Sequence, residues 1–153
     1  MTKAPSVSHL TSHLGYWLRY VSNHVSHTFA RKLEAENVTV AEWAVLRELY
    51  GEETIAPSRL AARLGLTRGA ISKLADRLIA KGFINREANT DDGRAHRLAL
   101  TSTGKSLVPK LSVLADQNDA EFFGDLTTDE RISIERILKS IVDRHGLKTI
   151  PIN

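Results

Sequence analysis

The sequence predicts a mainly α-helical protein with a small β-hairpin wing, arranged as a winged helix-turn-helix and flanked by further helices. Three observations lead to this fold class. Residues 58–82 hold two short helical patterns joined at a glycine turn, residues 83–101 follow as strand, polar turn and strand, and longer amphipathic patterns lie on both sides. The hairpin directly after the second helix indicates the winged form.

The N-terminal part predicts a long amphipathic helix from His9 to about Glu36, without an internal proline. Its apolar residues recur at intervals of three and four: Leu10, Leu14, Trp17, Leu18, Val21, Val25, Phe29 and Leu33. A capping box formed by Thr39 and Glu42 predicts a second helix that extends to about Tyr50. After it, residues 54–56 could add a short third strand to the hairpin.

Each helix of the helix-turn-helix has a recognisable start and end. The first begins at Pro57 and Ser58 and ends at Gly65, the residue type that most easily takes the left-handed conformation at a helix end. Thr67 can cap the second helix, and Gly82 ends it. The apolar face of this second helix consists of Ile71, Leu74, Ala75 and Leu78. Once that face is buried, the outward residues are Gly69, Ser72, Lys73, Asp76 and Arg77.

The segment after Gly82 predicts the wing. Residues 83–87 and 96–100 have the composition of strands, and residues 89–94 supply the Asn, Asp and Gly that tight turns need. The two strands should therefore pair as an antiparallel hairpin.

Two more helices are predicted beyond the wing. The first runs from Ser102 to about Phe123, and Pro109 inside it should cause a kink or mark the effective start, because proline removes a helical hydrogen bond. A capping box at Thr127–Glu130 opens the last helix, which continues to about His145.

Composition excludes several classes of function. The 153 residues include no cysteine, which excludes a disulfide framework, a thiolate metal site and a thiol redox switch. No stretch approaches the roughly 20 apolar residues of a membrane-spanning helix, so we expect a cytoplasmic protein without a membrane partner. Motifs for a nucleophile elbow, a phosphate loop or a metal tetrad are absent from the sequence, so we expect neither an enzyme nor a bound cofactor or metal.

Positive charge is concentrated in the middle of the chain. Residues 58–105 hold ten basic and four acidic side chains, a net charge of +6, whereas the whole chain carries +3 and the remainder therefore −3. The basic residues are Arg59, Arg63, Arg68, Lys73, Arg77, Lys81, Arg86, Arg94, Arg97 and Lys105. A basic segment that coincides with a helix-turn-helix indicates double-stranded DNA as the partner, and the alternative is an ordinary solvated surface.

The central part of the chain carries a long motif with fixed spacings. It consists of LAARLGLTRGAISKLADRLIAKGFINRE (60–87), the wing pattern Asp92-Gly93-Arg94, and Leu98-Ala99-Leu100-Thr101 with Gly104 just beyond. This motif resembles the MarR family of transcription regulators. The resemblance covers the middle third of the chain, and the flanking regions agree with the family in length and order. In the wing it implies that Asp92 braces the hairpin while Arg94 enters the minor groove of DNA.

We expect the second helix of the motif to contact DNA. Its N-terminus at Thr67 and Arg68 offers free backbone N–H groups and a positive charge to a phosphate. Side chains further along point to the major groove, where Arg or Lys can address guanine. Gly69 lowers helix stability by about 1 kcal/mol relative to alanine, which suits a close approach of DNA, or it is a first-turn glycine that matters little. The expected DNA contacts are Ser58, Thr67, Arg68, Gly69, Ser72, Lys73, Arg77, Asp92 and Arg94.

The flanking helices carry apolar stripes that one small winged domain cannot cover. We therefore expect a homodimer whose helices interdigitate, as the family resemblance also implies, and the alternative is an intramolecular bundle. This predicts a helical dimerisation region at 1–36 and 102–153 around a DNA-binding winged head at 37–101, together one intertwined domain.

The sequence also suggests two further sites, an effector pocket and a metal site. Regulators of the family bind small aromatic acids between the dimer helices and the winged head. In such an effector pocket we expect Tyr16, Tyr20, His24 and Arg47. Trp17 and Trp43 are expected in the core instead. The pairs His9/His13 and His24/His27 have spacings that can chelate Zn²⁺. The sequence offers them no further ligands, which favours a surface or interface role.

The hypothesis from the sequence is a homodimeric, sequence-specific transcription regulator that binds a palindromic DNA operator. We expect a repressor that a small ligand relieves, and an aromatic ligand is one candidate. Two alternatives stay open: a winged-helix protein-interaction module without DNA binding, and a histidine-based metal-responsive regulator. The charges of Lys73, Arg77 and Arg94 favour DNA binding over the first alternative, and metal analysis would decide the second.

Overall fold

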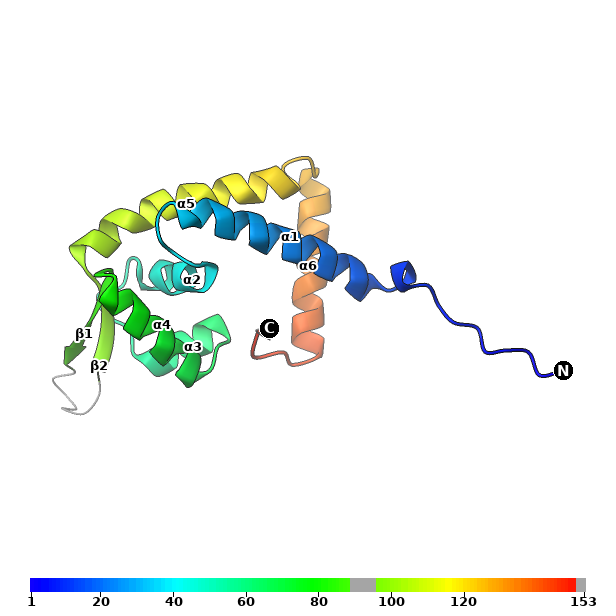
Figure 1. Ribbon diagram of the computed structural model, residues 1–153, viewed down its shortest axis with the longest axis horizontal. Coiled ribbons are helices and arrows are strands. Elements are labelled where there is room, and N and C mark those ends of the chain that lie inside the picture. Colours follow the sequence, from blue (N-terminus) through cyan, green and yellow to red (C-terminus); the bar gives the residue numbers. More distant parts are fainter. Residues whose placement is uncertain (89–95, 151–153) are drawn as a thin grey trace.

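The computed structural model describes residues 1–88 and 96–150. A short 3-10 helix, η1 (Leu10–Ser12), precedes α1 (Leu14–Glu34), α2 (Val40–Leu49), α3 (Pro57–Leu64) and α4 (Arg68–Ala80). The strands β1 (Ile84–Ala88) and β2 (His96–Leu100) follow, and then α5 (Ser102–Phe123) and α6 (Thr128–Arg144). Figure 1 shows the helix pair α3 and α4 beside the hairpin, which confirms the predicted fold class.

The turn between α3 and α4 has the predicted chemistry. Gly65 ends α3 in the left-handed conformation at φ 64°, where a side chain is strained. The Thr67 hydroxyl then accepts a hydrogen bond from the backbone N–H of Ala70 at 3.1 Å. These two local features fix where α4 begins, and therefore which of its faces turns outward.

The hairpin is antiparallel, with a register that runs from Ile84 opposite Leu100 to Ala88 opposite His96. The predicted third strand at 54–56 is reduced to one bridge, in which Ile55 and Leu98 exchange backbone hydrogen bonds of 2.9 Å in both directions. The turn residues 89–94 of the prediction lie outside the described residues.

Helix α5 passes through Pro109 without beginning there. The helix starts at Ser102, where the Thr101 hydroxyl caps it by accepting from the Gly104 N–H at 3.1 Å. Of the two alternatives predicted at Pro109, a kink or a start nearby, the start nearby is wrong, because this cap fixes an earlier start. Pro109 itself is exposed.

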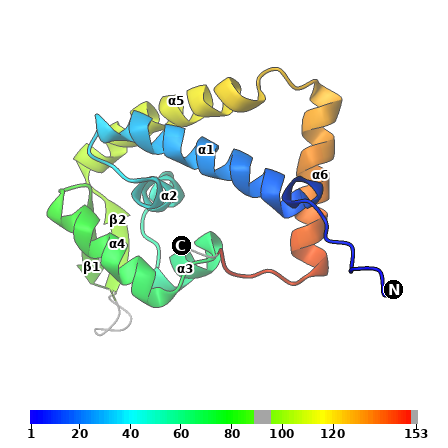
Figure 2. The same cartoon turned by 45° about the vertical axis from the view of Figure 1, so that its right-hand side comes forward.

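The hydrophobic core lies in the winged head, the C-terminal end of α1 and the first half of α5. Its most deeply buried members include Leu46, Leu60, Leu78, Ile84, Leu98 and Leu111. Helix α1 lies along α5, as Figure 2 shows, and the buried side chain of Asn118 donates to the Val25 carbonyl at 3.1 Å between the two helices. No helix in the described ranges is long and apolar enough to cross a membrane.

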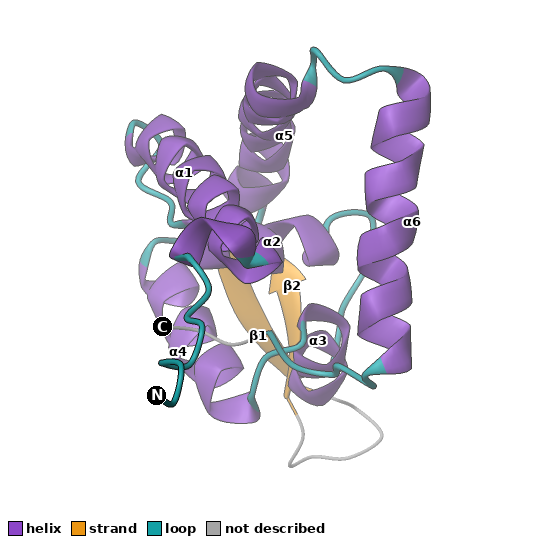
Figure 3. Cartoon of the chain, turned by 90° about the vertical axis from the view of Figure 1, so that its right-hand side faces the viewer, coloured by secondary structure: helices purple, strands orange, loops and turns teal. Residues whose placement is uncertain are grey.

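Helix α6 leaves its apolar side chains uncovered. None of its residues is buried, and Figure 3 shows it standing apart from α1 and α5. Its exposed apolar residues, 42–58% exposed, are Ile132, Ile134, Ile137, Leu138 and Val142. After α6 the chain returns to the winged head (Figure 2), where the Ile150 N–H donates to the Gly65 carbonyl at 2.8 Å.

Candidate nucleic-acid interface

Helix α4 has one buried and one exposed face, as its sequence predicts. The four apolar residues that were expected inside are all buried: Ile71, Leu74, Ala75 and Leu78. The residues that the helical wheel turns outward are all exposed: Gly69, Ser72, Lys73, Asp76 and Arg77. The exposed face therefore presents two small residues and a lysine along the N-terminal half of the helix.

The start of α4 is open to a ligand. Thr67 and Arg68 are exposed, and Ser58 is exposed in the first turn of α3. A Cβ atom added at Gly69 would come no closer to its surroundings than 4.0 Å, the distance to the Thr67 hydroxyl oxygen. The space beside Gly69 is therefore open, and the free N–H groups of a helix N-terminus are a general binding site for phosphate. Asp92 and Arg94, the expected wing contacts, lie outside the described residues.

Arg77 differs from the expectation that its charge points to the groove. Its guanidinium turns toward α2, where it donates to the Thr39 hydroxyl at 3.3 Å and lies 3.4 Å from a carboxylate oxygen of Glu42. The side chain is half exposed. The helical wheel placed its Cα on the outward face correctly, but the buried charge of Glu42 draws the long side chain back.

Glu42 is a fully buried carboxylate with two cationic neighbours. Its Oε1 accepts from the Thr39 N–H at 2.8 Å and from Lys81 Nζ at 2.9 Å, in addition to the Arg77 contact. Burial acts to raise the pKa of Glu42, but hydrogen bonds from Lys81 and Thr39 and the positive charge of Lys81 outweigh it, so the pKa lies below its ordinary value. The group is therefore ionised at neutral pH.

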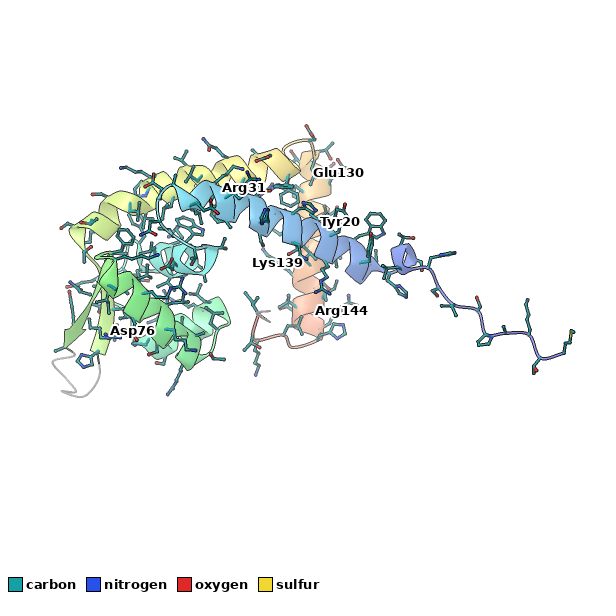
Figure 4. The ribbon with its side chains drawn as sticks, viewed as in Figure 1. Tyr20, Arg31, Asp76, Glu130, Lys139 and Arg144 are labelled. Carbon is teal, nitrogen blue, oxygen red and sulfur yellow. The ribbon has the colours of Figure 1, made fainter. Side chains whose placement is uncertain are left out.

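Another ion pair, separate from the Glu42 cluster, joins α4 to the wing. Arg86 of β1 donates to the carboxylate of Asp76, which Figure 4 shows on the side of α4 next to the hairpin. Arg97 of β2 is engaged within the protein, because its guanidinium donates to the hydroxyl and the carbonyl of Thr54 at 2.7 and 3.2 Å. Arg86 and Arg97 thus hold the head together, whereas Arg68 and Lys73 stay exposed on α4.

The structure does not bring the expected effector residues into one pocket within the chain. Tyr16, Tyr20 and His24 follow one another along α1, with the Tyr20 and His24 rings stacked at 5.1 Å. Arg47 instead lines a shallow depression of about 290 Å³ between α2 and α5, formed with Tyr50, Val108, Pro109, Ser112 and Val113. Spacing along α1 predicted the first group, but no sequence signal placed Arg47 relative to it.

The two tryptophans have different surroundings. Trp43 packs against the core edge-to-face with Phe29 at 6.3 Å, as expected. Trp17, expected in the core, is 49% exposed and donates through Nε1 to the Thr11 carbonyl at 2.8 Å. It lies on the part of α1 that extends beyond the winged head, where one chain offers it no cover.

The histidine pairs of α1 gain no further ligands in the structure. Among residues 1–88 and 96–150, no group of three or more His, Cys, Asp or Glu side chains is placed to hold a metal ion. His24 is stacked on Tyr20, which gives it an aromatic neighbour instead.

Glu42 and Lys81 are the residues of this site whose role the sequence analysis missed. The capping box predicted Glu42 only as the cap of α2, and that role is confirmed. The available signal was the i,i+4 spacing of Arg77 and Lys81, which places both on one side of α4. Their acidic partner lies 35 and 39 positions earlier in the chain, a pairing that spacing does not reveal.

Comparison with known proteins agrees with this geometry. Residues 36–95 match the model of the MarR family. The HTH-type transcriptional regulator SarZ of Staphylococcus saprophyticus is 31% identical over 135 residues, which cover 88% of this chain and 91% of SarZ. The multiple antibiotic resistance protein MarR of Escherichia coli is 28% identical over 130 residues, covering 84% and 90% of the two chains.

The solved structures give the same result. The crystal structure of a mutant of E. coli MarR complexed with operator DNA has a TM-score of 0.78 and 27% identity, and the match covers 84% of this chain and 93% of that one. SarZ is named as a transcriptional regulator and not as an enzyme. On its sequence, its winged helix-turn-helix and these relatives, this chain belongs to the MarR family of transcription regulators.

Proposed function

We propose that this protein binds specific palindromic DNA as a homodimer and represses transcription by occupying promoter DNA. The observation that carries the proposal is the exposed N-terminal half of α4, with Arg68, Ser72 and Lys73 above a completely buried opposite face. An α-helix fits the major groove of B-DNA, about 12 Å wide, when its outer side chains are small or polar. Such a regulator acts where DNA is kept, in the cytoplasm.

The residues divide by role. Lys73 and Ser72 would address base edges, whereas Ser58, Thr67, Arg68 and the backbone at Gly69 would bind phosphates and set the register. Asp92 and Arg94 are assigned to the wing by their match to the family pattern. The mutant E. coli MarR whose structure includes operator DNA supports a shared docking mode, because its fold matches over most of this chain.

Selection from random duplexes, followed by titration against salt, tests DNA binding. We expect recovery of a palindrome whose half-site centres lie about 34 Å apart, one helical turn. Each phosphate contact contributes a slope of about −0.9 to log K against log salt, so a dimer with roughly ten contacts should approach −9. A slope near zero, with no sequence recovered, would instead support a winged-helix module that binds protein.

The dimer proposal rests on uncovered apolar surface outside the winged head. In α1, Leu14 is 80% and Leu18 51% exposed, and α6 has no buried residue. We assign residues 1–36 and 102–153 to dimerisation and 37–101 to DNA binding. A second copy would cover these stripes, and a two-fold dimer would place two α4 helices on one face of the duplex.

Replacing Ile137 with glutamate should shift the protein from dimer to monomer. The side chain is 47% exposed in one chain, and a charge in a closed dimer interface would lose its hydration without a partner. Light scattering on a sizing column at micromolar concentration should give twice 17.0 kDa for the wild type and 17.0 kDa for the variant. Ala62→Glu on the exposed surface of α3, inside the winged head, is the control and should stay dimeric. A wild type that runs at 17.0 kDa would contradict the proposal.

A small ligand is proposed to release the DNA, and an aromatic ligand is one candidate. The supporting features are the aromatic run Tyr16, Tyr20 and His24 on α1 and the depression at Arg47 between α2 and α5. The aromatic run lies on α1 in the proposed dimerisation region, and the depression lies where α5 meets α2 of the winged head. A ligand bound at either place in a dimer would change the angle between the two α4 helices.

A further inference from the structure

The corner between α1 and α2 is joined to the C-terminal end of α4 by charge. Glu42, in the first turn of α2, is fully buried and is reached by Lys81 Nζ at 2.9 Å and by the Arg77 guanidinium at 3.4 Å. Lys81 Nζ also donates to the Asn37 carbonyl at 2.8 Å, and Arg77 to the Thr39 hydroxyl at 3.3 Å. Each of these links runs between α4 or its C-cap and residues 37–42.

Burial of the Glu42 carboxylate has a free-energy cost that requires an explanation. A buried carboxylate loses its hydration, and apolar residues of similar volume often stabilise a fold as well as a buried ion pair does. Glu42 Oε2 is buried and has no hydrogen-bond partner among the described residues. Stability alone therefore gives little reason for a charge at this position, whereas a requirement for one specific helix orientation does.

Geometry makes the cluster sensitive to the rotation of α4. Successive residues of an α-helix are separated by about 100°, so residues four positions apart lie nearly above one another. Lys73, Arg77 and Lys81 are spaced in this way and form one row along the helix. By holding Arg77 and Lys81, Glu42 also fixes the direction in which the Lys73 side chain projects from the exposed N-terminal half of α4.

We propose that Glu42 is a positioning residue for DNA binding, whose buried carboxylate fixes the rotation of the recognition helix α4 through Arg77 and Lys81. Arg77 is then a part of this anchor and does not read a base. The inference rests on the proposed DNA binding of α4 and adds the residues that orient it.

Glu42→Gln removes the charge and keeps the shape. Glutamine also serves in a capping box, so the start of α2 is preserved. Glu48→Gln on the same helix is the matched control, because Glu48 is partly exposed and lies 3.8 Å from Arg63, away from α4. Affinity is measured by fluorescence anisotropy at fixed salt on the selected duplex and on a scrambled one, far below the melting temperature of each variant.

We expect Glu42→Gln to bind the selected duplex about tenfold or more weakly, with a smaller loss on the scrambled duplex, as a misdirected base contact requires. Its dimer mass and circular dichroism should match the wild type, and Glu48→Gln should bind normally. If Glu42→Gln does not fold, Lys81→Met, which keeps the apolar stem of the lysine, takes its place. Unchanged affinity and specificity in the folded variant would overturn the inference.

A double-mutant cycle separates anchoring from reading. If Arg77 acts through Glu42, the two substitutions should not act independently on DNA affinity. The fold-loss in affinity of the double variant Glu42→Gln/Arg77→Ala should then be at least about fivefold smaller than the product of the fold-losses of the two single variants. Losses that multiply would show that Arg77 contacts DNA independently and would overturn its place in the anchor. A wild type that binds no selected duplex would refute the proposed function itself, which keeps the two failures distinguishable.

Discussion

Replacing Gly104 with alanine is expected to lower the free energy of unfolding by about 3–5 kcal/mol, among the largest effects of any single methyl group in this fold. A Cβ atom at this position would lie 2.1 Å from the Phe83 carbonyl oxygen and 3.2 Å from a methyl carbon of Leu100. Phe83 cannot move away easily, because its carbonyl also accepts the Thr101 N–H at 3.0 Å where the hairpin meets α5. Chemical denaturation followed by circular dichroism measures the loss.

Gly69→Ala provides the matched comparison for Gly104→Ala. Its added Cβ would have no neighbour closer than 4.0 Å, so the same substitution should leave the fold intact and add up to about 1 kcal/mol of helix stability. Equal destabilisation by the two variants would contradict this account of Gly104. If Gly69→Ala also loses DNA affinity despite its stable fold, the glycine is needed for close approach of the backbone to DNA.

Lys73→Ala is expected to weaken binding to the selected palindrome by about 1–3 kcal/mol per half-site, and twice that for a dimer that occupies both. Lys73 is exposed in the middle of α4, on the face opposite the buried stripe. Removal of a base contact should lower affinity for the matched duplex more than for a scrambled one. Anisotropy titrations at constant salt give both values.

Lys110→Ala on exposed α5 removes the same charge away from the recognition helix. It should leave the ratio of matched to scrambled affinity unchanged. If Lys73→Ala and Lys110→Ala lowered the affinities for both duplexes equally, Lys73 would contribute only general charge, and base reading would have to be assigned elsewhere.

The features that the sequence predicted correctly depend on neighbours close in the chain. Gly65, the Thr67 cap and the two capping boxes each act within four residues, so the pattern contains all the information needed. The same is true of the periodicity that placed the residues of α4 on its buried or exposed face. The start of α5 was ambiguous because two local signals competed, and the Thr101 cap prevailed over the helix-breaking tendency of Pro109.

The features that sequence reasoning missed depend on partners far apart in the chain. A helical wheel gives the direction of the Arg77 Cα, but a long side chain follows the nearest buried charge, which Glu42 supplies from another helix. Arg47 was grouped with Tyr16 and Tyr20 on residue type alone, and the packing of α2 on α5 places it beside Val108 and Ser112. Burial of a carboxylate and the packing of helices are tertiary facts, so spacing could not reveal them.

After α6 the chain returns to Gly65 in the winged head, but it is only weakly attached there. Beyond α6, the Ile150 N–H reaches the carbonyl of the residue that turns α3 into α4, while Ile150 itself is 65% exposed. A single hydrogen bond of this kind contributes about 1 kcal/mol, little more than thermal energy. Near its other end α6 is joined to α5 by one ion pair, Arg131 to Asp119 at 2.9 Å, whose side chains are about half exposed, so it contributes at most about 1 kcal/mol. These two contacts hold α6 weakly, and the surface that covers its apolar side has the larger influence on its angle. Because the hydrogen bond to Gly65 lies at the helix-turn-helix, a change in the angle of α6 would keep or break a contact with the turn that precedes the recognition helix.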